Sequence, residues 1–200
     1  MSVYCDMVTN GGGWVVFQNR FEGSVDFDQD WNSYKRGFGN LSGEFWLGND
    51  NIHRLTTIGG AVLRIELRDR ADGLEYAEYR SFMVDGECNK YKLTVGSYSG
   101  TTQYNALDLR LQMPTVQERF IHNGRYFTTK DRDNDVGPGA NYNCAVSFGS
   151  GWWFGGCVAC NLNAPYSGDV LDTSKIPWHG RGSNPIKKVQ MKVRSLSDSP

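Results

Sequence analysis

The sequence predicts an α+β domain: an antiparallel sheet with a few short helices, followed by a long irregular segment rich in loops. Two observations lead to this fold class. Residues 62–68 (VLRIELR) alternate apolar and polar side chains, as strands with one buried face do. Residues 130–163 contain Pro138 and many glycines, which interrupt both helical and strand periodicity.

The first predicted elements form a hairpin. Residues 4–6 begin a short strand, the run 10–13 (NGGG) is a strong turn signal, and residues 14–18 (WVVFQ) are typical of a buried strand. The period then changes between residues 26 and 39, where Trp31, Tyr34 and Phe38 recur at the spacing of one helical face.

Capping residues set the ends of two short helices. Either Asp28 or Asp30 can cap the first helix, and Gly37 or Gly39 can end it. Asn49 and Asp50 begin a second small helix that carries Ile52 and Leu55.

A meander with one solvated face is expected next. Its strands are 62–68, 76–84 and 91–95, with Leu63, Ile65 and Leu67 on the core face. After Gly96 the pattern fades, which predicts a loop over 97–113. Residues 188–194 (KVQMKVR) alternate again and are predicted to return to the sheet, whereas 195–200 are expected to be disordered.

Composition narrows the class of protein. The formal net charge is −1 and no block of like charges exists, so neither a nucleic-acid partner nor an anionic membrane surface is favoured. The longest apolar run is too short to span a bilayer. Five cysteines without paired zinc-type spacings suit an oxidising compartment, which predicts a secreted, extracellular protein.

Three aspartates at alternate positions, Asp131, Asp133 and Asp135, precede the glycine-rich run. Calcium takes six to eight oxygen ligands from carboxylates, carbonyls and water, and glycines let backbone carbonyls turn toward an ion. An EF-hand is excluded because its glycine position holds Val136 and its final glutamate position holds Tyr142. A calcium site is therefore predicted, with a solvated acidic turn as the alternative.

Collinear runs over nearly the whole chain carry a family resemblance. They are VYCDM (3–7), GGGWVVFQNR (11–20), the run 23–56, YKLTVGSYSG (91–100), FTTKDRDND (127–135), the NCAV, GWWF and NLN motifs within 143–163, and KKVQMKVR (187–194). The chain resembles the fibrinogen C-terminal domain of fibrinogens, ficolins, tachylectins, angiopoietins and tenascins. This implies a secreted, non-catalytic recognition domain.

The resemblance also implies a domain organisation. Residues 1–200 form one domain whose N-terminal segment is truncated, and oligomerisation is expected through segments upstream of this chain. Residues 1–22 end an N-terminal subdomain, 23–113 with 187–194 form a sheet and helix subdomain, and 114–186 form a loop-rich subdomain for calcium and ligand.

Site residues follow from the resemblance by position. Ca²⁺ is expected on the carboxylates of Asp133 and Asp135 and the carbonyls of Gly137 and Gly139, which leaves Asp131 as a local hydrogen-bonding residue. A disulfide between Cys144 and Cys157 is implied. A loop of this length would contribute about 3 kcal/mol by closure entropy.

A ligand pocket beside the calcium loop is implied as well. The positions that carry over to it are Phe148, Cys157, Val158, Asp172, Thr173 and Asn184, with a cis peptide expected between Gly156 and Cys157. Lectin-type relatives bind acetyl groups there against aromatic walls, but Val158, Asp172 and Asn184 replace the usual histidine and aromatic side chains. The pocket is therefore expected to persist with a more polar wall.

Competing interpretations remain for three features. Trp152 and Trp153 can be a ligand platform or core packing. The Cys157-to-Cys160 spacing is formally C-x-x-C, but no βαβ pattern surrounds it, so redox chemistry is disfavoured. The three histidines show no metal-ligand spacing, and no catalytic triad or phosphate loop is found.

The expected function is lectin-like pattern recognition of microbial or host glycans in innate immunity, acetylated sugars among them. The alternative is a module that recognises a protein surface or peptide end. Microbial surface polysaccharides or a protein ligand are the expected partners, and no enzymatic activity is predicted.

Overall fold

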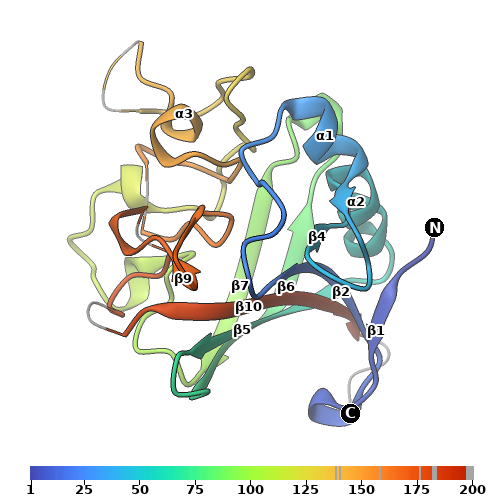
Figure 1. The fold of residues 1–200 in the computed structure, drawn as a ribbon. Helices are drawn as coiled ribbons and strands as arrows, with labels where there is room; N and C mark the ends of the chain where they lie inside the picture. The colour runs from blue at the N-terminus through green and yellow to red at the C-terminus, as the bar shows by residue number, and fades with distance from the viewer. Residues whose placement is uncertain (138, 140, 158, 176, 182–183, 197–200) are drawn as a thin grey trace.

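The computed structural model describes residues 1–137, 139, 141–157, 159–175, 177–181 and 184–196, and it has the α+β fold that the sequence predicts. An eight-stranded sheet has the order β3-β4-β2-β10-β5-β6-β7, with β1 paired to β2 (Figure 1). Its strands are β1 (Tyr4–Asp6), β2 (Trp14–Arg20), β3 (Phe38–Gly39), β4 (Phe45–Trp46), β5 (Ala61–Asp69), β6 (Leu74–Val84), β7 (Leu93–Gly100) and β10 (Ile186–Ser195).

The last strand of the chain lies in the middle of the sheet. β10 pairs antiparallel with β2 on one side and β5 on the other, so the predicted return of 188–194 is confirmed. Leu63, Ile65 and Leu67 are fully buried and form the core face of β5. The opposite face is less solvated than expected, because Val62, Arg64 and Lys192 are buried there.

Two short helices, α1 (Trp31–Arg36) and α2 (Asn49–Thr57), pack beside the sheet (Figure 1). Asp30 caps α1 by accepting a hydrogen bond from the Ser33 amide at 2.7 Å. Gly37, with φ 95°, ends it, and a Cβ there would lie 2.6 Å from the Leu47 carbonyl oxygen. Phe38, predicted on the helix, instead begins β3.

One predicted loop is partly wrong. β7 continues through Gly100, and its residues pair with β6 as far as the Gly100 and Ala77 positions. Backbone pairing does not require apolar side chains, so the polar run GSYSG (96–100) gave no sign in the sequence that the strand continues. The free edge of β7 is covered by Asn123, whose amide nitrogen donates to the Val95 carbonyl at 2.9 Å and whose oxygen accepts from the Val95 amide at 3.0 Å.

The loop-rich half of the domain is the part of the chain between β7 and β10, and the remainder is the sheet half. In its described residues the loop-rich half contains only small elements. These are α3 (Cys144–Phe148), the two-stranded sheet β8 (Tyr166–Ser167) and β9 (Val170–Leu171), and 3-10 turns at Leu109–Leu111, Glu118–Phe120 and Thr173–Lys175; two further 3-10 turns, Thr9–Gly11 and Glu87–Asn89, lie in the sheet half. The sequence did not predict α3. Asn143 caps it, accepting from the Val146 amide at 3.1 Å, and Gly149 ends it with φ 65°.

The buried core runs continuously from the sheet into the loop-rich half, where Trp152 and Trp153 join it. A smaller apolar cluster forms around Leu109, Ile121 and Ala159. In the part of the chain that the structure describes, no helix has the length and apolar character needed to cross a membrane.

Candidate calcium and ligand-binding site

Asp131 connects the loop of three aspartates, residues 131–135 (the aspartate loop), to the sheet half by hydrogen bonds. Its Oδ1 accepts hydrogen bonds from the Trp31 amide at 2.9 Å and from the Thr129 hydroxyl at 2.7 Å. The Trp31 amide lies at the start of α1, where backbone donors have no partner within the helix. Asp131 is therefore the local hydrogen-bonding residue that the sequence predicts.

Asp133 and Asp135 lie next to each other on the following turn. Asp133 Oδ1 accepts from the Asp135 amide at 3.1 Å, while the Asp135 carboxylate accepts from the amides of Gly137 at 2.7 Å and Cys144 at 2.8 Å. Burial and, to a smaller extent, the neighbouring Asp133 carboxylate raise the pKa of Asp135 to about 6, against the opposing effect of the two amides.

This donor set fits a calcium ion. In the described residues neither Asp133 nor Asp135 forms an ion pair with Lys, Arg or His. Each carboxylate oxygen that accepts an amide keeps a second lone pair. No group of three or more His, Cys, Asp and Glu side chains lies together in the described ranges, so further ligands would be carbonyls or water. Gly137 is half-buried and Gly139 exposed on the same loop.

A disulfide ties this loop to the segment behind it. Cys144 bonds to Cys157, with their Cα atoms 5.3 Å apart, which is the pairing the resemblance implies. Because the Cys144 amide also donates to Asp135, the aspartate loop, α3 and Cys157 are linked to one another. Cys160 is a buried free thiol, so a redox pair between Cys157 and Cys160 has no support.

The expected cis peptide between Gly156 and Cys157 is wrong: every peptide bond between described residues is trans. The chain turns there through a positive φ of 108° at Cys157 instead. Gly155 and Gly156 allow the close approach, since a Cβ at Gly155 would meet the Arg119 carbonyl oxygen at 2.2 Å. The Gly156 amide donates to that same oxygen.

His122 orients the chain after the disulfide, a role that the sequence did not reveal. Its Nδ1 lies 2.8 Å from the Trp153 carbonyl, and its Nε2 accepts from the amides of Ala159 at 3.1 Å and Cys160 at 3.0 Å. Burial lowers the pKa of His122 to about 4, so the ring is neutral with its proton assigned to Nδ1 by these bonds. No spacing in the sequence could have identified it.

The predicted pocket residues separate into two groups. Phe148 and Asp172 both lie near Lys175, a residue that the sequence did not indicate. The Lys175 ammonium lies 5.8 Å from the centre of the Phe148 ring and donates to the Ser147 carbonyl at 2.8 Å. The Lys175 amide also donates to the Asp172 carbonyl at 3.0 Å.

Thr173 and Asn184 line a separate cavity of about 200 Å³ together with Trp178 and Arg181. Phe148, Cys157 and Asp172 are not part of its lining. Asn184 is exposed, and its Nδ2 donates to Asp69 at the end of β5 at 2.9 Å. Val158, another predicted pocket position, lies outside the described residues.

Trp152 and Trp153 are buried, which supports core packing over a ligand platform. The Trp153 indole donates to the Tyr91 carbonyl at 2.7 Å, and its ring contacts those of Trp46 and Phe127 at 6.1 and 5.2 Å between centroids.

Comparison with known proteins establishes the class to which this fold belongs. The family model of the fibrinogen beta and gamma chains, C-terminal globular domain, matches residues 1–196, so the chain belongs to that family. Among curated relatives, human ficolin-3 is 42% identical over 97% of this chain, and ryncolin-4 of Cerberus rynchops is 48% identical over 97%. Human tenascin-R is 43% identical over 97%.

The chain spans only part of these relatives: 61% of ficolin-3, 53% of ryncolin-4 and 13% of tenascin-R. Among solved structures, the fibrinogen-like globe domain of human ANGPTL2 is 38% identical with a TM-score of 0.82, covering 97% of this chain and 85% of that one. Lamprey fibrin D-dimer, complexed with the peptide Gly-His-Arg-Pro-amide, is 37% identical with a TM-score of 0.81, covering 96% and 63%.

Proposed function

We propose that this domain is a secreted, calcium-binding recognition module with a lectin-like function. It would recognise microbial or host glycans in innate immunity by binding, without catalysis. The observation that carries the proposal is the connection between the paired carboxylates and the disulfide: Asp135 accepts from the Cys144 amide at 2.8 Å, and Cys144 bonds to Cys157. Similarity to ficolin-3 and ryncolin-4 supports the same class.

Asp133 and Asp135 would hold Ca²⁺ with their carboxylates, and Gly137 and Gly139 with their carbonyls. The bound ion supplies positive charge that balances two adjacent carboxylates. The chain itself shapes the ligand wall: the disulfide fixes α3 and the segment from 155 to 157, and His122 fixes the amides of Ala159 and Cys160. Calcium would thus order this wall, formed by α3 and the segment from 155 to 157, rather than contact the sugar.

We propose two sets of ligand contacts: Phe148, Cys157, Val158 and Asp172, and, at the separate cavity, Thr173 and Asn184. The half-buried Phe148 ring offers a flat apolar surface for the face of a sugar ring, and Asp172 and Asn184 offer hydrogen-bonding groups for hydroxyls. Because one domain of this kind binds weakly, avidity from an oligomer of the whole protein is part of the proposal.

Binding to an array of microbial and host glycans, with and without a chelator, tests the proposal. We expect glycan binding that the chelator abolishes and that Asp133→Asn lowers at least tenfold. Asp169→Asn is the matched control, since Asp169 is an exposed carboxylate paired with Arg70 on the β8–β9 turn. Absence of binding to any glycan or bacterial surface, or equal loss in both variants, would contradict it.

A protein-binding module is the second candidate. The observation that favours it is the cavity of about 200 Å³ at Thr173 and Asn184, which lies apart from Phe148 and combines the Trp178 ring with the polar groups of Arg181 and Asn184. A related fold has been solved with a short peptide bound, in lamprey fibrin. Pull-down of a protein ligand that Asn184→Ala abolishes, with no glycan bound, would favour this candidate over the lectin.

A further inference from the structure

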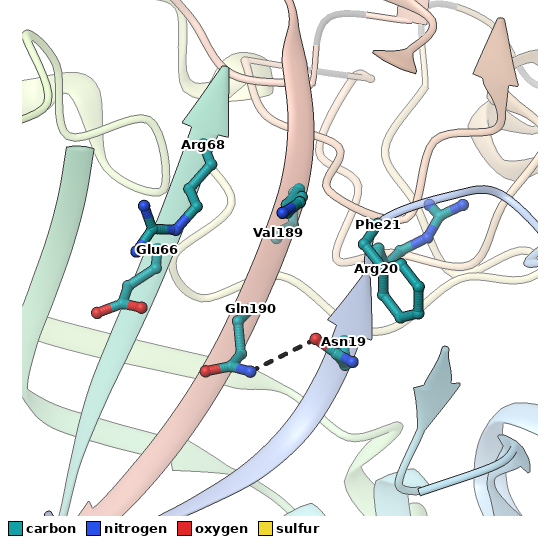
Figure 2. A pocket seen from close by; sticks show the side chains of 8 residues that line it. Asn19, Arg20, Phe21, Glu66, Arg68, Val189 and Gln190 are labelled. Carbon is teal, nitrogen blue, oxygen red and sulfur yellow. Dashed lines mark hydrogen bonds between the residues drawn. The ribbon is translucent and has the colours of Figure 1, made fainter. Parts of the chain in front are cut away.

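The outer face of the sheet carries a polar groove that is separate from the calcium loop. It spans β2, β10 and β5, has a volume of about 380 Å³, and is lined by Asn19, Phe21, Glu66, Arg68, Lys188 and Gln190 among others (Figure 2). The strand register places these side chains in rows. Lys188 lies opposite Arg68, and Gln190 lies opposite both Asn19 and Glu66.

At one end of this groove the charged side chains are already paired with one another. Glu66 is held by Arg64 at 2.9 Å and by Lys192 at 3.0 Å, and Lys192 is also 2.6 Å from Asp6. Both carboxylates have a pKa below the usual range; burial opposes this, but the bond to Lys192 and, for Glu66, the bond to Arg64 prevail. The cations at this end of the groove are therefore already paired with carboxylates of the protein.

The other end is different, because two cationic residues, Lys188 and Arg68, occupy paired positions on neighbouring strands there. Like charges directly opposite in an antiparallel pair are unfavourable. Arg68 forms an ion pair with Asp72 at 3.6 Å, and no other carboxylate pairs with it among the described residues; the Asp72 side chain is 73% exposed. Lys188 is exposed and forms no ion pair with any residue that the structure describes. An anionic group between Lys188 and Arg68 would relieve this repulsion.

In the row next to the cation pair, the two positions on β10 and β2 are neutral. Gln190 and Asn19 face each other there, with only a long 3.4 Å contact between their side chains (Figure 2). Their amides can both donate to and accept from hydroxyl groups. Phe21, half-buried, adds apolar ring surface at the end of β2. Arg20 does not contribute a charge, because its guanidinium donates to the Leu162 and Ala164 carbonyls inside the protein.

We propose that this groove is a second, calcium-independent site for an acidic saccharide, with the sulfate or uronate group between Lys188 and Arg68 and sugar hydroxyls on Gln190 and Asn19. A bare anion would use only the cation pair. A nucleic acid would need a basic surface over many phosphates, which a chain of net charge −1 does not offer. The proposal is independent of the lectin pocket and of calcium.

Calorimetry in the presence of EDTA tests this site with three probes: a chondroitin sulfate tetrasaccharide, neutral cellotetraose and inorganic sulfate. We expect saturable binding of the sulfated tetrasaccharide that weakens as salt rises, and much weaker binding of the other two. Lys188→Gln and Arg68→Gln should each weaken it about tenfold, as loss of a charge-assisted hydrogen bond predicts.

Two control variants separate this site from its surroundings. Lys187→Gln removes the same charge one residue away, where the ammonium lies 3.9 Å from Asp169, and should leave binding unchanged. Asp133→Asn should also leave it unchanged, which distinguishes this proposal from the calcium-dependent one. Absence of saturable binding, equal weakening by Lys187→Gln and Lys188→Gln, or equal affinity for inorganic sulfate would overturn the proposal.

Discussion

The two halves of this domain are stabilised in different ways. In the sheet half, alternate apolar residues of β5 and β10 bury one face, and the backbone groups bond to neighbouring strands. In the loop-rich half few backbone groups have such partners, so buried polar side chains supply them. Asn163 Nδ2 donates to the Gly151 carbonyl at 2.9 Å, and Gln18 Nε2 donates to the Leu162 carbonyl at 3.0 Å. A segment without regular elements thus depends on individual side chains.

This difference predicts that single changes in the loop-rich half can have the larger effects. Trp153→Ala removes a buried indole from the junction of the two halves and leaves the Tyr91 carbonyl without its donor. We expect a loss of about 3–5 kcal/mol in the free energy of unfolding. Urea unfolding measures it, and a loss below about 1 kcal/mol would show that the two halves are not joined through this residue.

Removal of the disulfide should destabilise the loop-rich half selectively. Cys144→Ala with Cys157→Ala is expected to lower the free energy of unfolding by about 3 kcal/mol. Amide hydrogen exchange should rise between residues 130 and 160 and stay slow in β5 and β10. Cys160→Ala, which removes a buried free thiol, is the matched control, and an equal effect of this control would contradict the assignment.

Acid should weaken the domain through His122. Its folded-state pKa of about 4 lies below the ordinary 6.5, so the folded state binds fewer protons than the unfolded chain. The contribution is present in full above pH 6.5 and is lost as the pH falls toward 4, by on the order of 3 kcal/mol.

Unfolding midpoints measured between pH 7 and pH 4.5 check this dependence. His122→Asn should be less stable at pH 7 and should lose the part of the pH dependence that His122 causes. An unchanged pH profile in this variant would assign the acid sensitivity to other groups.

A conservative change in the sheet half should have the smallest effect of the series. Ile65→Val removes one methylene from a fully buried site on β5, for an expected cost of about 1 kcal/mol with no local increase in exchange. Thermal unfolding checks it. A cost comparable with that of Trp153→Ala would remove the proposed contrast between the halves.

The same contrast explains how much the sequence predicted. Periodicity located β5, β6 and β10, because a strand with one buried face has apolar side chains at every second position. It also located α1 through Trp31 and Tyr34, and of the two candidate caps, Asp28 and Asp30, the structure has Asp30. The C-terminal end of β7 was not predicted, because its polar residues pair with β6 through their backbone groups and show no apolar alternation.

Pattern was less informative in the loop-rich half. Asp133 and Asp135 are close in sequence, so their proximity in the fold could be predicted. The bonds from His122 to Ala159 and Cys160 join residues more than 35 positions apart and leave no periodic signal. The separation of Phe148 from the cavity of Asn184 likewise depends on how irregular segments pack, which local propensity does not determine.

We propose that calcium on Asp133 and Asp135 orders the loop-rich half. Amide hydrogen exchange of the wild type and of Asp133→Asn, each with calcium and with EDTA, tests it most directly. We expect calcium to slow exchange between residues 131 and 160 in the wild type only, with β5 and β10 unaffected. Identical exchange with and without calcium in the wild type, or equal slowing in Asp133→Asn, would contradict the claim.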